Sequence, residues 1–328
     1  MTAVEITIIG LGQIGASIGL ALAEQKTKVH RVGVDYDQAN TRAANKMGAL
    51  DQAVNNIPSA VRKADLVILA LPVDEVQETL KLIADELHPG AVVMNTSPIR
   101  VAIDQWAKEI MLPDRYFISI TPTLNPAYLP DKAAGVEAAR ADLFKNGLMV
   151  ITTPPGTHAD AIKLATDLTT LLGASPYYAD SLEADGLMAS THFLPKLISA
   201  ALVNTVIDQP GWREARKLAG QPFYEVSNPI MDLDEVKVLG QGAILNRDNV
   251  IRTLDQFILA LQDLREMIAK QDSAGLSNLM THALEGRMIW WQQRQRGNWE
   301  SMPADAAPTP GNMFGRMFGI GTKPKDNK

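Results

Sequence analysis

The chain has 328 residues, of which 46% are hydrophobic and 21% charged, a balance typical of a globular protein with about two domains. It contains no cysteine, which excludes disulfide bonds, thiolate metal sites and cysteine nucleophiles. The net charge of −6 comes without a basic block, and the five histidines form no metal-binding spacing, so we expect neither nucleic acid nor a metal ion as a partner.

The first elements predict a βαβ unit. Glu5–Ile9 is a short run rich in β-branched residues, as in a buried parallel strand. Apolar residues then recur at helical spacing over Gln13–Glu24, and Val29–Val34 predicts a second strand.

A GxGxxG pattern, formed by Gly10, Gly12 and Gly15, lies where the strand turns into the helix. Such glycines allow a tight turn, let the backbone approach a pyrophosphate and let the helix pack closely on the strand. The free N–H groups at the start of the helix then face the phosphates. We therefore expect a dinucleotide here, bound also by Gln13 and Ile14 at the start of the helix.

Asp35 ends the second strand, about 20 residues after Gly15. Its carboxylate would accept hydrogen bonds from the adenosine ribose hydroxyls and would repel a 2′-phosphate. No arginine follows it directly. These features predict NAD as the cofactor rather than NADP.

An alternative is that the uncharged run Ile6–Ala23 is a signal or a membrane anchor. Its four glycines, its polar residues Gln13 and Ser17 and the acidic flank at Glu5 oppose that interpretation. We expect no membrane partner and a cytoplasmic location.

Strands and helices alternate in the next part of the chain. The expected elements are helices at Gln38–Met47, about Ser59–Lys63, Asp74–Leu87 and His158–Leu172, and strands at Asp65–Leu71, Ala91–Met94, Tyr116–Ile120, Leu148–Thr153 and Ser175–Tyr178. This alternation predicts an α/β fold with a doubly wound, Rossmann-type sheet in a dinucleotide-binding domain of residues 1–179.

Ligands of such a sheet bind at the carboxyl ends of its strands. Three turns follow strand ends there and are candidate walls of a site, namely Leu71-Pro72-Val73, Asn95-Thr96-Ser97-Pro98 and Thr121–Pro126. We expect Leu71 and Pro72 beside the cofactor, and Ser97 and Thr121 near the reacting groups. Alternatively, their polar residues only form turns and cap helices.

From Ser181 onward only helices are expected, at Leu182–Ile207 with a kink or junction at Pro195, at Asp234–Gln271 and at Ser277–Arg296. Their apolar stripes are too broad for a solitary domain. We therefore predict a helical dimerisation and substrate domain at residues 180–300 and a homodimer. Residues 301–328, rich in proline and glycine with a basic end, predict a flexible tail.

Several segments occur in a familiar order. They are GLGQIGASIGLAL, ADLVILALPV, HPGAVVMNTSPIR, DLFKNGLMVITTPPGT, the Leu194-Pro195 pair inside a long helix, and NRDNVIRTLDQFILALQDLREMI. Together, over about Ile6–Ile268, they resemble the prephenate/arogenate dehydrogenase family of tyrosine biosynthesis. The resemblance implies an N-terminal nicotinamide-binding domain, a helical dimerisation domain and an active site between them. It also implies that Gly10, Gly12, Gly15 and Asp35 bind the cofactor.

The chain differs from that family at the residues that carry the chemistry. The histidine of the family's HPMAG-like turn falls at Thr121, and the two histidines of its SHLPH-like motif fall at Phe193 and Lys196. The serine of its DVGSVK-like turn falls at Pro98, and the arginine that holds a substrate carboxylate falls near Phe223.

Hydride transfer from an alcohol needs a group for the hydroxyl proton and a cation for a carboxylate. His192 and Lys196 are four residues apart, and Asn204 is eight beyond Lys196, so the three share roughly one helix face. A lysine in apolar surroundings can serve as acid or base. The arrangement looks like that of β-hydroxyacid dehydrogenases, although Ala200 takes the place of their asparagine. Alternatively, Lys196 extends to solvent and His192 is an ordinary surface residue.

Three functions therefore remain open. The first is an NAD(P)-dependent dehydrogenase that oxidises prephenate or arogenate. The second is a dehydrogenase of the same scaffold that acts on another hydroxy acid, with Lys196 as its acid/base. The third is a non-catalytic NAD-binding protein. We favour an enzyme that transfers hydride from a small carboxylate substrate to nicotinamide.

Overall fold

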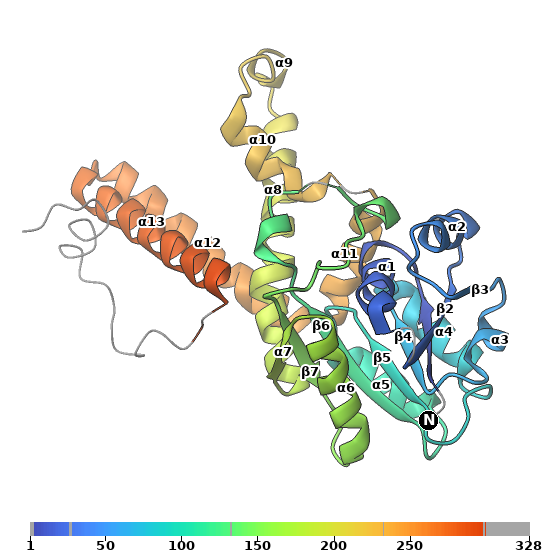
Figure 1. Ribbon diagram of the computed structural model, residues 1–328. Coiled ribbons are helices and arrows are strands. Elements are labelled where there is room, and N and C mark those ends of the chain that lie inside the picture. The colour runs from blue at the N-terminus through green and yellow to red at the C-terminus, as the bar shows by residue number, and fades with distance from the viewer. Residues whose placement is uncertain (1–2, 26–27, 132, 232, 298, 300–328) are drawn as a thin grey trace, which may run out of the picture. The chain divides into compact units, whose positions relative to one another are not determined.

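The computed structural model describes residues 3–25, 28–131, 133–231, 233–297 and 299. An eight-stranded sheet, in the order β3-β2-β1-β4-β5-β6-β7-β8, forms the centre of its N-terminal part (Figure 1). The strands are β1 Val4–Ile9, β2 Val29–Val34, β3 Gln52–Ala53, β4 Leu66–Leu69, β5 Val92–Asn95, β6 Tyr116–Pro122, β7 Leu148–Thr152 and β8 Ser175–Tyr178. All pairs from β3 to β6 are parallel, so the predicted doubly wound sheet is confirmed.

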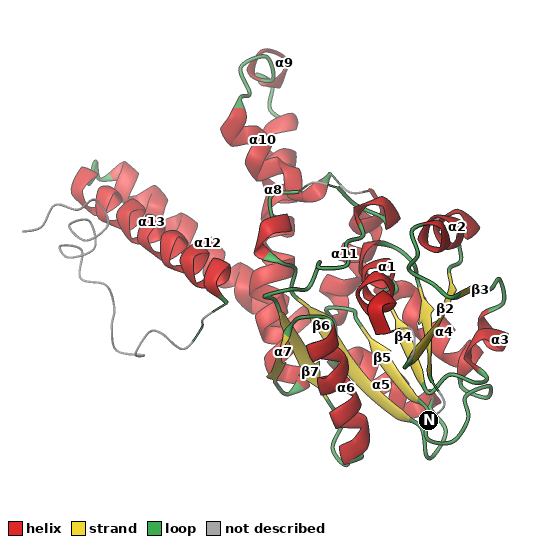
Figure 2. Ribbon diagram, viewed as in Figure 1, coloured by secondary structure: helices red, strands yellow, loops and turns green. Residues whose placement is uncertain are grey.

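Helices cover both faces of this sheet (Figure 2). They are α1 Gln13–Ala21, α2 Gln38–Lys46, α3 Ile57–Val61, α4 Val73–Ile83, α5 Val101–Ile110 and α6 Ala159–Leu171. Side chains of a strand point alternately to its two faces. Accordingly, Leu66 and Ile68 pack with α1, α2 and α6, whereas Val67 and Leu69 pack with α3, α4 and α5.

The last two strands reverse the direction of the sheet. β7 runs antiparallel to β6, with Thr121 opposite Val150, and β8 is parallel to β7. The carboxyl ends of β7 and β8 therefore lie at the opposite edge from those of β1, β4 and β5. The segment between β6 and β7 contains two short 3₁₀ helices, η2 Pro126–Tyr128 and η3 Val136–Ala138, and is tied to α1 by the amide of Arg140, which donates to Ser17 Oγ at 2.9 Å.

The chain after the sheet is helical. Its elements are α7 Ser181–Met188, a π-helical turn η4 Ala189–Phe193, α8 Leu194–Ile207, α9 Trp212–Ala215, α10 Gln221–Ser227, the 3₁₀ turn η5 Asn228–Ile230, α11 Leu233–Leu245, α12 Arg247–Ala269 and α13 Ser273–Arg296. A helix junction was predicted at Pro195, and the structure has one there: the π-helical turn η4 ends just before α8, whose second residue is Pro195. Proline has no backbone N–H to donate to the carbonyl of the preceding turn.

The prediction of a single helix over Asp234–Gln271 is wrong. The structure has two helices there, because Asn246 leaves the helical conformation with φ −104° and ψ 30°. The Asn246 side chain donates instead to the carbonyl of Asp185, 61 positions earlier, at 2.8 Å. A tertiary hydrogen bond therefore accompanies the break.

Among the described residues, those up to 279 form one compact unit and those from 280 onward form a second. The boundary predicted at residue 179 lies inside the first unit and stays a prediction. In the second unit, the Arg287 guanidinium lies 4.6 Å from the centre of the Trp290 ring. The predicted tail, residues 301–328, lies outside the described residues.

The run Ile6–Ala23, weighed above as an anchor, contains most of β1 and all of α1. Among the described residues, one helical run, Ser181–Ile207, is long and apolar enough to cross a membrane, with a mean hydropathy of 1.3. Length and composition are weak evidence for a span. The expected cytoplasmic location and the expected lack of a membrane partner stay predictions.

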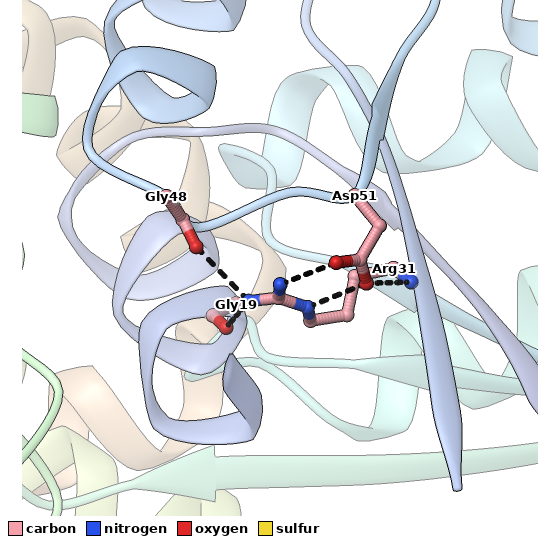
Figure 3. Close-up of polar contacts among 4 residues, drawn as sticks. All are labelled: Gly19, Arg31, Gly48 and Asp51. Atoms are coloured by element: carbon pink, nitrogen blue, oxygen red, sulfur yellow. Dashed lines mark hydrogen bonds and ion pairs between the residues drawn. The ribbon is translucent and has the colours of Figure 1, made fainter. Parts of the chain in front are cut away.

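A buried arginine fastens the first two helices to the sheet (Figure 3). The Arg31 side chain, 1% exposed, forms two hydrogen bonds to the Asp51 carboxylate, at 2.7 and 2.9 Å. Its Nη1 also donates to the carbonyls of Gly19, at 2.8 Å, and Gly48, at 3.0 Å. The planar guanidinium satisfies all these acceptors at once. It thereby links β2, α1 and the end of α2.

Arg31→Met is expected to destabilise the protein by about 3 kcal/mol, because it removes both side-chain hydrogen bonds to Asp51 and leaves the buried carbonyl of Gly19 without its donor. Urea unfolding measures the change. The matched control is Arg62→Met, because Arg62 is 61% exposed and its ion pair with Glu86 lies at the surface. The urea midpoint of this variant should equal that of the wild type.

The same variant tests the electrostatic part of this effect. The Arg31 hydrogen bond lowers the pKa of Asp51 from 3.8 to about 2. A carboxyl whose pKa is lower in the native state stabilises the fold above pH 3.8, and this contribution is lost as the pH falls through about 2. The loss should be smaller in Arg31→Met, where only the backbone amide of residue 31 still donates to Asp51; an identical pH dependence in both proteins would contradict the assignment.

Candidate active site

The GxGxxG turn has the geometry that its glycines predicted. Gly10 has φ +90°, and a Cβ there would lie 2.3 Å from the carbonyl oxygen of Ala70. A Cβ on Gly15 would lie 1.9 Å from the carbonyl oxygen of Gly10. A Cβ on Gly12 would have no described heavy atom within 4 Å. The first and third glycines therefore permit close packing, and the second leaves open space beside the backbone.

The start of α1 is suited to an anion. Its N-cap is Gly12, and no side chain among the described residues caps it. The amides of the first turn and the positive end of the helix dipole are therefore available to a pyrophosphate. Ile14 lines the adjoining cavity, whereas Gln13 Nε2 donates to the carbonyl of Ala138 at 3.4 Å.

Asp35 stands at the end of β2 with its carboxylate fixed by the backbone. Oδ2 accepts from the amide of Leu11 at 2.6 Å, and Oδ1 accepts from the amide of Asp37 at 2.7 Å. Asn40 Nδ2 adds a longer contact of 3.4 Å. A carboxylate held in this way next to the glycine turn fits the ribose hydroxyls of a dinucleotide.

A cavity of about 300 Å³ opens at the carboxyl ends of β1, β4 and β5. Its walls are Ile14, Ala70, Leu71, Pro72, Val73, Thr96, Ser97, Pro98, Ile99, His192, Phe193, Lys196, Val238, Leu239 and Gly242. The predicted residues Leu71, Pro72 and Ser97 therefore meet His192 and Lys196 in one place. A more open depression lies along α12, and all of its described lining residues belong to that helix.

His192 reaches the cavity from the π-helical turn η4. Burial, with a smaller effect of the Lys196 charge, lowers its pKa from 6.5 to about 4. The imidazole is therefore neutral at neutral pH and can accept a hydrogen bond. Its ring meets the ring of Phe193 edge-on, with 5.1 Å between centres. π-Helical turns are frequent at functional sites because they change the direction of side chains.

The far wall of the cavity comes from α11, which the sequence had not indicated. Val238, Leu239 and Gly242 line it there. A Cβ on Gly242 would lie only 3.0 Å from the Phe193 ring, so the glycine allows this close contact. A glycine inside an apolar helix was the available signal for such an approach.

Thr121 is not among the described residues that line the cavity. It is 8% exposed, its hydroxyl donates to the carbonyl of Ser97 at 2.8 Å and it accepts from Arg100. Its catalytic role stays a prediction. Phe223 likewise lies outside the described lining, with its ring tilted by 45° against that of Trp212 and 5.6 Å between ring centres.

Arg100 is a buried cation that the sequence had not singled out. Its guanidinium donates to the carbonyl of Ser97 and to Thr121, so it fixes the turn that forms the cavity floor. Burial lowers its pKa to about 10, against the opposing effect of the Asp185 and Asp104 charges. The signal available was its place directly after Asn95–Ile99, as the basic residue nearest to that strand end.

Asp185 connects the helices to this edge of the sheet. Its carboxylate accepts from the amide of Arg100 at 2.8 Å and from the amide of Val101 at 3.1 Å, which caps α5. Burial is the largest cause that raises its pKa, and these amides lower it. The hydrogen bond from Asn246 adds the start of α12 to the same junction.

The assembled site has the features of a dinucleotide cradle beside a cavity. Gly10, Gly12, Gly15 and Asp35 form the cradle, and His192 and Lys196 are the titratable groups in the cavity. No group of three or more histidine, aspartate or glutamate side chains that could hold a metal ion occurs within the described part of the chain.

Comparison with known proteins agrees with this geometry. Residues 18–178 match the profile of "Prephenate dehydrogenase, nucleotide-binding domain", and residues 180–282 match "Prephenate dehydrogenase, dimerization domain". Prephenate dehydrogenase of Bacillus subtilis is 25% identical over 284 residues, which cover 83% of this chain and 72% of that protein. Cyclohexadienyl dehydrogenase of Zymomonas mobilis is 24% identical over 270 residues, which cover 82% and 89%.

The fold has a close counterpart among solved structures. The structure of prephenate dehydrogenase from A. aeolicus in complex with hydroxyphenyl propionate and NAD+ aligns with a TM-score of 0.76. The alignment covers 88% of this chain and 99% of that chain at 20% sequence identity, so it is evidence for the fold. The two profile matches together span most of the chain, and the chain therefore belongs to the prephenate dehydrogenase family of oxidoreductases.

Proposed function

We propose that this chain is an NAD-dependent dehydrogenase that oxidises a ring hydroxyl of prephenate or arogenate. The observation that carries the proposal is the cavity itself, in which the strand-end turns face His192 and Lys196. Family membership and the relatives' names support this substrate class.

The cofactor assignment rests on the cradle described above. NAD bound there would supply the hydride acceptor. The amides at the start of α1 bind its pyrophosphate, the Asp35 carboxylate accepts from its ribose hydroxyls, and Leu71 and Pro72 pack against it.

His192 and Lys196 have different roles towards the substrate. Neutral His192 accepts a hydrogen bond from the hydroxyl that becomes a carbonyl, since its lowered pKa prevents it from carrying a charge. Lys196 supplies a positive charge that binds a carboxylate or takes part in the proton transfer. Ser97 completes the polar wall. The apolar remainder of the cavity excludes water from the reaction.

A second candidate is a dehydrogenase of the same scaffold for another hydroxy acid. The position of a family histidine is occupied by Phe193, which is 2% exposed and packed against α11. A buried phenyl ring cannot donate to a substrate. This favours a substrate that needs fewer polar contacts, with Lys196 as its acid/base.

We also infer that two copies of the chain pair through the helical region. Apolar side chains there remain exposed, among them Ile244 at 74%, Leu259 at 59% and Ile268 at 62%. Light scattering at micromolar concentration should give about twice 35.6 kDa. The mass of a single chain would contradict the homodimer.

The function is tested by NAD reduction at about 340 nm, the absorption band of the reduced nicotinamide. Purified protein is offered prephenate, arogenate and a panel of 3-hydroxy acids, with NADP in parallel. We expect turnover of prephenate or arogenate with NAD. Turnover of a hydroxy acid alone would support the second candidate, and NAD binding with no turnover of any substrate would contradict both.

Lys196→Met is expected to abolish turnover while NAD affinity stays unchanged, because Lys196 lines the cavity and is not part of the cradle formed by the glycine turn and Asp35. Lys196→Arg separates the two roles: a restored KM indicates a carboxylate contact, whereas a kcat that stays low indicates proton transfer. Lys217→Met, a change at a lysine that is 60% exposed on another segment, is the control. Full activity of Lys196→Met would refute the assignment.

A further inference from the structure

The first turn of α4 lies beside the end of β2. The hydroxyl of Tyr36, the residue after Asp35, makes a 3.0 Å hydrogen bond with Thr79 Oγ1 of α4. Thr79 Oγ1 in turn donates to the carbonyl of Glu75 at 2.7 Å. Residues four apart share a face of a helix, so Glu75 and Thr79 both face the end of β2. Glu75 is therefore a second acidic residue at the adenosine end of the dinucleotide cradle.

The two acidic residues of this turn have different neighbours. Asp74 forms an ion pair with Lys237 of α11 at 3.6 Å. The Glu75 side chain is partly buried and, as far as the described residues show, makes neither a hydrogen bond nor an ion pair. Glu75 therefore has no directly bound cation that would screen its charge from a ligand.

The electrostatic potential around Glu75 is negative. Burial raises the pKa of Glu75, and the charges of Asp74 and Asp35 raise it further, whereas Lys237 lowers it. Asp35 and Glu75 belong to the two segments that the hydrogen bonds of Tyr36 and Thr79 hold together. The first basic residue after Asp35 is Arg42, which is exposed on α2.

We infer that Glu75 is a second determinant of cofactor choice, a carboxylate that together with Asp35 excludes a 2′-phosphate from the ribose site. This inference rests on the dinucleotide site of the proposed function. NAD brings neutral ribose hydroxyls to Asp35, so the charge of Glu75 does not affect its binding. NADP brings a phosphate dianion towards two carboxylates, and like charges in a partly buried site repel strongly. Replacement of Asp35 alone therefore leaves a barrier to NADP.

The test is the binding of NAD+ and NADP+ to the full chain by isothermal titration calorimetry, which needs no turnover. Glu75→Gln should tighten NADP+ binding on the order of tenfold and leave NAD+ binding unchanged. Glu78→Gln is the matched control. Glu78 lies on the same helix, is 72% exposed and pairs with Lys81, so the same change of charge there should alter neither affinity.

The salt dependence of NADP+ binding distinguishes electrostatic repulsion by Glu75 from a change in the shape of the site. The gain of Glu75→Gln for NADP+ should shrink as the KCl concentration rises, because screening weakens the repulsion in the wild type. Combined with Asp35→Asn, the two changes should be non-additive if both act on one phosphate. Unchanged NADP+ affinity in Glu75→Gln while NAD+ still binds, or an equal gain in Glu78→Gln, would overturn the inference. A wild type that binds neither dinucleotide would overturn the proposed cofactor site, and this inference with it.

Discussion

The arrangement of the helices around the cavity depends on one buried residue, Asp185. Its carboxylate caps α5 through two backbone amides, and its carbonyl accepts the side chain of Asn246. A buried carboxylate is costly unless it is hydrogen-bonded, so these partners have to stay in place for the fold to be stable. The same residue belongs to α7, and it therefore fixes the start of the helical run whose π-helical turn carries His192.

Most polar groups beneath the cavity satisfy one another, although Arg100 Nε has no hydrogen-bond partner among the described residues. Arg100 and Thr121 both donate to the carbonyl of Ser97, and this leaves the Thr121 hydroxyl fully engaged. The carboxylates of Asp185 and Asp104 balance the Arg100 charge at longer range. A floor of this kind is rigid but offers few groups to a ligand. The polar chemistry of the cavity therefore lies on the opposite side, where His192 and Lys196 project from the helices.

Fold and chemistry have diverged to different extents in this chain. The backbone follows a prephenate dehydrogenase structure with a TM-score of 0.76 although only 20% of the residues are identical. Buried apolar positions tolerate such replacement when volume and pattern are kept. A functional site does not tolerate replacement in the same way, because its function depends on a few specific side chains. The alignment of Thr121 and Phe193 with histidines of the family stays a prediction, and it would place the divergence of this chain at its chemistry.

The sequence by itself determined most of the strands and helices and the glycine turn after β1. Runs of β-branched residues, helical periodicity, the glycine spacing and Asp35 are local patterns, and local patterns are sufficient to predict strands, helices and a phosphate-binding turn. Only the tertiary structure decided the direction of β7, the break at Asn246, the link that Arg31 forms between β2, α1 and the end of α2, and the role of α11 as a cavity wall. Each of these depends on contacts between residues distant in the chain, such as the pair Asp185 and Asn246 separated by 61 positions, and no periodicity records such contacts.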